Sequence, residues 1–421
     1  MYKLYIKQAW AILKENRIIS SLSIAGTALS IAAIMLVVLV YQVIYADYAP
    51  ENHRFRTLYV DAFQAGSKTD QGSNRGQMGV RVLRECLYDL KIPEAVTGIS
   101  MMQMPVNLPG QKIVDKYPVK YTDTAFWKVF DFDFISGAPF TASDFDSGIH
   151  RAVMSESAAR KVFGAADVVG RTFRINFEDY TVCGVVKDVS MAASSAYAKI
   201  WMPYTVNKAL MEANVGYYEA TTGAFTACIL ARSSADFSAI RNEAQRALAR
   251  FNMTLKNTKT NFLAGPITQM DKLMGGNGFY PVKTAEFIAS RGVLILFLLV
   301  LPALNIVGIT LTQFRKRRSE IGVRKAFGAP FRVIVEQVLV ENMLCSLIGG
   351  VIGLFLSYGL LSLCKNLLIS NDVELTAGML LKPGTFLLAF LFTLLMNLIS
   401  VGIPAIRSAR MPIVTSLNDV D

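Results

Sequence analysis

Four long apolar stretches divide the chain, and each is long enough to cross a membrane as a helix. Crossing about 30 Å of hydrocarbon takes roughly 20 helical residues. The stretches run approximately over Ile18–Tyr45, Gly292–Phe314, Val335–Cys364 and Thr385–Ile406. This pattern predicts a membrane protein with four transmembrane α-helices.

The long segment between the first two stretches has a different, mixed pattern. Short runs rich in β-branched and aromatic residues predict strands at Arg54–Phe63, Arg171–Phe177, Tyr180–Val186 and Phe225–Ala231. Helical spacing of apolar residues predicts helices at Gly76–Lys91, Ser155–Gly164 and Asp236–Phe251. We therefore expect a large α+β extracytoplasmic domain with two subdomains, inserted between helices 1 and 2.

Three local features of this domain follow from residue type. Ser155 is suited to be the N-cap of its helix. The run Arg171–Val186 predicts a hairpin that turns at Glu178–Asp179, and Ala65–Gln77, rich in Gly and Ser, predicts a flexible loop.

Together these patterns divide the chain into nine expected segments. They are an amphipathic helix on the cytoplasmic face (1–17), a first span (18–45), the α+β domain (46–285), a second span (286–314), a cytoplasmic loop (315–332), a third span (333–364), a short external loop (365–384), a fourth span (385–406) and a cytoplasmic tail (407–421).

Composition agrees with a membrane location, because an apolar fraction of 52% is high for an ordinary soluble protein. A cleaved signal peptide is the main alternative for the N-terminus. Its apolar run is too long, however, and Ile44-Tyr45-Ala46 does not fit the small residues of a cleavage site. We expect an uncleaved anchor.

The net charge of +11 is concentrated beside the expected spans, which argues against nucleic-acid binding. Cytoplasmic loops collect Lys and Arg, so the basic residues place both termini and the loop 315–332 in the cytoplasm. In residues 1–17, Lys3, Lys7 and Lys14 share one helical arc, which favours a helix lying on the inner membrane surface. A merely basic flank of the first span remains the alternative.

Two short patterns suggest catalytic or nucleotide-binding chemistry, and neither fits well. Gly164–Thr172 differs from a phosphate-binding loop in spacing and in having Arg171 at the lysine position, so we expect a helix end that leads into a strand. Asp131 and Asp133 alternate with phenylalanines, as paired acids or cation ligands would, but solvated acids opposite a buried aromatic face give the same pattern. We expect no catalytic residue on this chain.

Cysteine and histidine usage argues against disulfides and against a His-rich metal site. The external segment holds three cysteines, Cys86, Cys183 and Cys228, an odd number that is typical of buried free thiols. The only histidines are His53 and His150. We expect no bound metal.

The segment Gln313–Met343 is more structured than a charged loop needs to be. Glu320 and Arg324 have the favourable i, i+4 order, Gly328 is suited to end a helix, and Pro330 is suited to begin the next one. A short helix across the inner membrane surface is therefore expected. The alternative is that its basic residues only fix the topology.

Several motifs resemble those of the MacB/FtsX-like family of ABC transporter permeases. "RRSEIGVRKAFGA" resembles the family motif R-x-x-E-I-G-[IV]-R-[KR]-A-x-G-A, and "IPAIRSARMPIVTSL" resembles its C-terminal ending. "VFDFDFISGAPF", "AVMSESAARKVFGAADVVGRTFRI" and "YTVCGVVKDV" are similar to the order of motifs in the MacB-type periplasmic domain. The resemblance covers nearly the whole chain.

The resemblance implies a permease of the bacterial inner membrane that couples ATP hydrolysis to shape changes of a periplasmic domain. It implies that the short helix docks on a cytoplasmic ABC ATPase through Arg317, Glu320, Ile321, Gly322, Arg324, Lys325, Ala326 and Gly328. Because the chain shows no Walker motif, we expect the ATPase, with its ATP and Mg²⁺, on a separate subunit. A second permease copy, identical or related, is implied, and a periplasmic adaptor with an outer-membrane channel is a further candidate partner.

Two kinds of activity remain open within this family. The leading one is export or extrusion of a substrate from the periplasm or envelope, and the alternative is FtsX-like signalling that activates an envelope enzyme. Residues suited to helix packing in the second and third spans are Pro302, Asn305, Ser346, Gly349, Gly350 and Gly353. For the glycines, ordinary membrane packing is the preferred interpretation.

Overall fold

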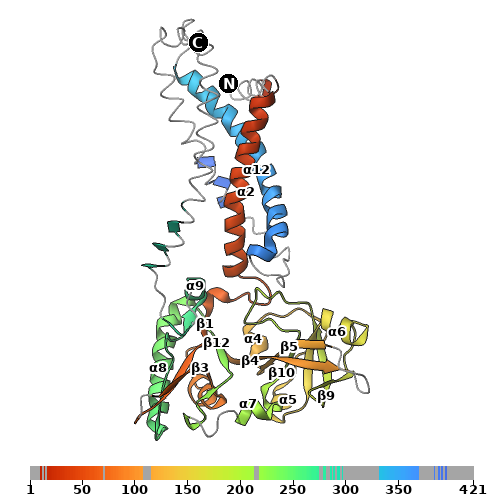
Figure 1. Cartoon of the computed structure of the whole chain (residues 1–421), viewed down its shortest axis with the longest axis vertical. Helices are drawn as coiled ribbons and strands as arrows, with labels where there is room; N and C mark the ends of the chain where they lie inside the picture. Colours follow the sequence, from red (N-terminus) through yellow and green to blue (C-terminus); the bar gives the residue numbers. More distant parts are fainter. Residues whose placement is uncertain are drawn as a thin grey trace. The chain divides into compact units, whose positions relative to one another are not determined.

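The computed structural model describes residues 17–69, 72–107, 115–212, 218–274, 278–280 and 331–368, with individual positions within 10–14, 285–296 and 384–395. These residues fall into two compact units (Figure 1). A helical unit contains the helices α2, as far as Val43, and α12. An α+β unit contains Ile44–Thr284.

The helical unit is built on two long apolar helices, α2 (Arg17–Tyr45) and α12 (Phe331–Leu368). Within them, Ser20–Val40 and Met343–Leu363 are each 21 residues long and apolar enough to cross a membrane. The expected spans 18–45 and 333–364 lie in these helices. The expected spans 286–314 and 385–406 lie largely outside the described residues.

The α+β unit contains a ten-stranded sheet among its described residues. Nine strands follow one another in the order β14 (Ile267–Thr268), β1 (Thr57–Val60), β12 (Thr226–Leu230), β4 (Ala95–Asn107), β5 (Asp115–Thr122), β10 (Ile200–Pro203), β7 (Arg151–Ser155), β9 (Glu178–Val186) and β6 (Phe134–Gly137). The tenth strand, β8 (Thr172–Ile175), pairs with β4 and β9. Most neighbours are antiparallel, but β10 runs parallel to β5, and β7 runs parallel to β9.

A smaller four-stranded sheet lies in the same unit. Its order is β11 (Thr222–Gly223), β3 (Ser73–Met78), β2 (Phe63–Ser67) and β13 (Thr258–Asn261). The two sheets share one buried core that includes Leu58, Phe63, Val119, Phe173 and Ile229.

Helix α8 (Phe237–Thr254) covers part of this core with one apolar face. Ile240, Ala244, Ala247, Leu248 and Phe251 are buried at helical spacing. The helix packs on the short helical segment Leu83–Leu87. Shorter helices complete the unit: α3 (Val80–Val82), α4 (Phe126–Val129), α5 (Ala142–Asp146), α6 (Glu156–Phe163), α7 (Lys208–Glu212) and α9 (Gln269–Leu273).

Two predicted helix ends are confirmed. The side chain of Ser155 accepts a hydrogen bond from the backbone N–H of Ala158, and so caps α6. Gly164 ends the helix with φ 75°, a left-handed conformation that glycine adopts without a Cβ penalty. The chain then leads to β8, as expected for Gly164–Thr172.

The predicted hairpin forms, but its turn is not at Glu178–Asp179. Ile175 pairs with Glu178, so the two turn residues are Asn176 and Phe177, both with positive φ. Asp179 lies in β9, where its carboxylate accepts a hydrogen bond of 2.7 Å from Nε of Arg174. In this register Phe173 pairs directly with Tyr180, and both side chains are buried.

One prediction near the start of the unit is wrong, and a second is confirmed only over part of its length. Ala65–Gln77 is not a flexible loop, because β2 and β3 pair there as a hairpin with Phe63 opposite Gly76. Helix formation in Gly76–Lys91 begins only at Val80, since Gly76–Met78 belongs to β3. Most residues of β3 are polar and exposed, so this strand lacks the apolar alternation of a typical strand.

Candidate functional site

Glycines of α12 let it approach α2 closely. A Cβ added at Gly353 would lie 2.5 Å from the carbonyl oxygen of Ala28, and one at Gly349 would lie 3.0 Å from the Cβ of Thr27. A side chain at Gly353 would push the backbone of α2 away, and one at Gly349 would require Thr27 to move by a few tenths of an ångström. Close backbone approach through small residues is a known way in which membrane helices associate.

The other predicted packing residues have different surroundings. A Cβ at Gly350 would lie 2.7 Å from the ring of Phe390 and 3.6 Å from Cδ1 of Ile31 on α2, so this glycine makes room mainly for an aromatic side chain. Ser346 is buried, with 3% of its surface exposed. Pro302 and Asn305, and all eight predicted ATPase-coupling residues, lie outside the described residues. The roles of the whole set in coupling remain predictions.

A buried ion pair holds the chain directly after α2. Arg54 and Glu51 are 2% and 3% exposed, and the Arg54 Nε lies 2.6 Å from the Glu51 carboxylate. The Arg54 guanidinium also donates to the carbonyl of Ala46 at 3.0 Å, to the hydroxyl of Tyr48 at 2.7 Å and to the carbonyl of Ala192 at 2.8 Å. We call these five residues the Arg54 cluster.

The Arg54 cluster joins two distant parts of the chain. Ala46 and Tyr48 follow α2, whereas Ala192 belongs to the loop before β10. The second oxygen of Glu51 accepts hydrogen bonds of 2.9 Å from the backbone N–H groups of Ser195 and Ala196. Burial raises the pKa of Tyr48 to about 12, so its hydroxyl stays protonated.

A second buried charge holds the same loop from the sheet side. Lys120, on β5, is 1% exposed and donates to the carbonyls of Ser194, at 3.2 Å, and of Ser195. The indole N–H of Trp201 donates to the carbonyl of Ala196 at 3.0 Å. The loop 192–196 is thus fastened to the residues after α2 and to two central strands of the large sheet.

The two acids of the predicted pair are exposed, and each lies beside a basic side chain. The Asp131 carboxylate lies 3.2 Å from Nε2 of His53, and that of Asp133 lies 3.0 Å from Nζ of Lys187. Phe130, which directly precedes Asp131 in the sequence, is buried. Among the described residues no group of three or more His, Cys, Asp or Glu side chains is arranged to hold a metal ion.

The cysteines of the α+β unit are free thiols, as predicted. Cys86 and Cys228 are buried, and burial raises the pKa of each to about 12. Burial also raises the pKa of the partly exposed Cys183 to about 11. All three are therefore protonated and unreactive at neutral pH.

A groove of about 360 Å³ beside β4 contains a buried carboxylate, that of Asp123. One of its oxygens accepts from the hydroxyl of Thr97 and the N–H of Phe126, and the other accepts from the hydroxyl of Tyr88 and the N–H of Gly98. Both oxygens are therefore already used in holding β4 to the turn after β5.

The Arg54 cluster and the burial of Lys120 could not be predicted from the sequence. Charged residues are rarely buried unless they are paired, and nothing in the local pattern shows that Lys120 faces the core. The one available signal was the spacing of Glu51 and Arg54, three residues apart directly after a span.

Comparisons with known proteins now assign the chain to a family. A model of the MacB-like periplasmic core domain matches residues 20–247, and a model of the FtsX-like permease C-terminal region matches residues 292–413. The second match includes the predicted coupling segment.

Similar proteins agree with this assignment. The macrolide export ATP-binding/permease protein MacB 1 of Yersinia pestis bv. Antiqua (strain Antiqua) is 24% identical over 416 residues, which are 96% of this chain and 58% of that protein. The uncharacterized ABC transporter permease YknZ of Bacillus subtilis (strain 168) is 24% identical over 331 residues, 77% of each chain.

A solved structure, that of the periplasmic region of MacB from Actinobacillus actinomycetemcomitans, is 18% identical with a TM-score of 0.35 and covers 50% of this chain and 92% of that one. The chain thus spans little more than half the length of the MacB relatives that it matches, and the matched families are those of the periplasmic and permease parts. The chain belongs to the MacB/FtsX-like family of ABC transporter permeases.

Proposed function

We propose that this chain is the permease subunit of an ABC transporter that works by mechanotransmission. ATP hydrolysis by a separate cytoplasmic ATPase, with Mg²⁺ bound there, drives a change of shape in the periplasmic domain. That change exports or extrudes a substrate from the periplasm or envelope. The order of the two family matches, periplasmic core domain followed by permease region, carries the proposal.

The proposed topology has four spans, with both termini in the cytoplasm and the α+β unit in the periplasm. Two copies of the permease, or this chain and a related one, form the membrane part. The ATPase docks on the short helix that contains Glu320, Ile321 and Gly322, followed by Gly328. Support comes from the excess of basic residues beside the spans and from the family motif in this loop.

In this proposal, two sets of contacts transmit the displacement of the helices. Close packing at Gly349 and Gly353 ties α12 to α2. The chain of α2 continues directly into the Arg54 cluster, which fastens it to the loop before β10. Because β10 lies between β5 and β7, a displacement of the end of α2 is delivered to the middle of the large sheet.

The decisive experiment separates shape from charge in the docking segment. We expect Gly328→Val, or Glu320→Lys combined with Ala326→Trp, to abolish co-purification with the ATPase or to uncouple its turnover. The physical reason is that a docked helix needs close fit and a defined end. Lys316→Arg keeps the charge and is the matched control, with no expected effect.

Pull-down of the partner ATPase from detergent extracts gives the readout, with membrane insertion checked in parallel. If the shape-changing variants capture the ATPase and support its turnover at the parental level, the segment only fixes topology and the coupling proposal is wrong.

A further inference from the structure

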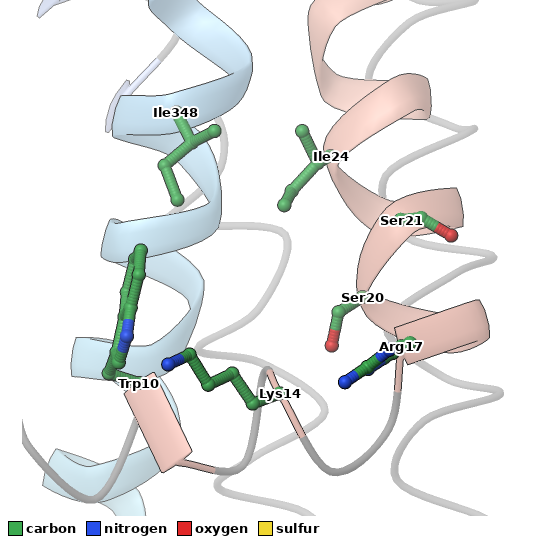
Figure 2. Close-up of a pocket in the computed structure, with 7 residues that line it drawn as sticks. All are labelled: Trp10, Lys14, Arg17, Ser20, Ser21, Ile24 and Ile348. Carbon is green, nitrogen blue, oxygen red and sulfur yellow. The ribbon is translucent and has the colours of Figure 1, made fainter.

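A groove of about 460 Å³ opens at the start of α2, inside the helical unit. Figure 2 shows its lining, which is divided into a polar and an apolar part. The described residues that line it are Trp10, Lys14, Arg17, Ser20, Ser21, Ile24 and Ile348. The first six precede or belong to α2, and Ile348 comes from α12.

The polar part is basic. The side chains of Lys14 and Arg17 are exposed and point into the groove, as does the hydroxyl of Ser20 (Figure 2). The described lining residues include no acid, and neither cation forms an ion pair with another described residue. Two cations and a hydroxyl are groups that bind a phosphate oxygen.

The hydroxyl groups of Ser20 and Ser21 point in different directions, and only that of Ser20 is placed to bind a ligand in the groove. Ser20 is only 7% exposed, and its hydroxyl is directed towards the two cations (Figure 2). The hydroxyl of Ser21 points away from them and donates to the backbone carbonyl of Ile18 at 3.0 Å. Ser21 is thus a natural control for Ser20.

The apolar part of the groove begins one helical turn further along. Ile24 and Ile348 face each other across it from α2 and α12 (Figure 2). Beyond Ile348, α12 keeps the apolar side chains of Val351, Ile352 and Phe355 exposed. An inorganic anion has no group that packs on such an apolar surface, whereas the acyl chain of a lipid does.

We propose that this groove binds the phosphate group of one anionic phospholipid, with an acyl chain against Ile24 and Ile348. Lys14, Arg17 and Ser20 hold the phosphate, and Trp10 lies where aromatic rings of membrane proteins meet the headgroup level. Basic pockets beside membrane helices on the cytoplasmic side suit anionic headgroups. The cytoplasmic leaflet follows from the proposed topology, but binding itself does not depend on that topology.

Native mass spectrometry of the purified full chain in detergent tests the proposal, with phosphatidylglycerol and phosphatidylcholine as probes. We expect one phosphatidylglycerol to be retained per chain and little phosphatidylcholine. Lys14→Gln with Arg17→Gln should weaken phosphatidylglycerol retention by roughly tenfold or more, because two charge-assisted contacts are lost. Lys14→Arg with Arg17→Lys keeps both charges and should retain the lipid.

Single serine-to-alanine variants are less disruptive than the double charge variants, so they test binding without loss of folding. Ser20→Ala should weaken retention by a few fold, on the order of one hydrogen bond, and Ser21→Ala should not. Equal retention of the two lipids by the wild type, or equal effects of the two serine variants, would overturn the proposal.

A third pair of variants separates a lipid from a free phosphate. Ile348→Trp fills the apolar part and should abolish phosphatidylglycerol retention, while Leu347→Trp, at an exposed neighbouring position of α12, should not. Inorganic phosphate at millimolar concentration should not displace the lipid. Displacement by phosphate, or full retention in Ile348→Trp, would mean a simple anion site and would overturn the lipid assignment. The lipid experiment uses the permease chain without the ATPase. Its outcome therefore does not depend on whether the ATPase docks on the segment around Glu320.

Discussion

Lys120 shows how a single buried charge responds to pH. Burial lowers the pKa of its ammonium to about 8, whereas an unfolded lysine titrates near 10.4. Between these two values the unfolded chain binds more protons than the folded one, so the contribution of Lys120 to stability rises with pH. Below about pH 8 the folded state bears the full free-energy cost of burying the charged ammonium. Between pH 8 and pH 10 this cost decreases, because the buried group loses its proton.

The first residue-scale prediction compares the wild type with Lys120→Met. From pH 7 to pH 10 the free energy of unfolding of the wild type should rise relative to the variant, on the order of 2 kcal/mol. Tyr48, whose folded-state pKa is raised, makes the folded state less stable towards pH 10 in both proteins, so its effect cancels in the difference.

Denaturant titration of the full chain, followed by tryptophan fluorescence, measures this difference, since Trp201 binds the same loop. If the free energy of unfolding changed with pH in the same way in both proteins, Lys120 would not be a charged group in the core.

Residues with strictly local roles are the ones that the sequence predicts well. Ser155 and Gly164 act through bonds within a few residues, so their types are sufficient to place a helix start and end. Lys120 and Arg54 act through contacts with the loop 192–196, more than 70 residues away from Lys120 and more than 130 away from Arg54. No local pattern carries that information.

At the scale of elements, α12 offers two glycines with opposite surroundings. A Cβ at Gly353 would lie 2.5 Å from the Ala28 carbonyl on α2, but a Cβ at Gly359 meets nothing within 4 Å. Both glycines are in the same helix, so replacing either one by leucine improves the helix propensity of its position by the same amount. Only the contact with α2 distinguishes them.

We therefore expect Gly353→Leu to destabilise the protein by about 1–3 kcal/mol, the usual cost of overpacking. Gly359→Leu should be neutral or slightly stabilising. The measurement is the thermal unfolding temperature of the full chain in detergent. Equal unfolding temperatures for the two variants would contradict the close packing of α12 on α2.

The strength of the apolar signal decided which elements could be predicted. The spans that correspond to α2 and α12 stand out by length and composition alone. Helix α8 stands out by its periodic apolar face. The sequence predicts a loop rather than the hairpin of β2 and β3, because most residues of β3 are polar and exposed and the strand forms through backbone pairing rather than side-chain burial.

At the scale of the whole molecule, the proposed topology makes a direct prediction about accessibility. Ser147, exposed after α5, should be labelled as Ser147→Cys by an impermeant thiol reagent in cells with a permeable outer membrane. Ser319→Cys, in the proposed cytoplasmic loop, should be labelled only after lysis. The wild type provides the background, which the burial of Cys86 and Cys228 keeps low.

Labelling of Ser319→Cys in intact cells, or protection of Ser147→Cys, would contradict the four-span topology. The family match gives the class of molecule and the order of its parts. The number of spans rests on the apolar stretches and their orientation on the charge distribution, so this labelling experiment is the most direct test of the topology.

The Arg54 cluster also restricts how this region can change during evolution. Loss of either Glu51 or Arg54 alone leaves a buried charge without its partner, which costs about 3–5 kcal/mol. That is a large part of the 5–15 kcal/mol by which a typical protein is stable. Descendants of this chain should therefore keep both residues or replace both together by apolar ones, so that positions 51 and 54 are inherited as a single unit.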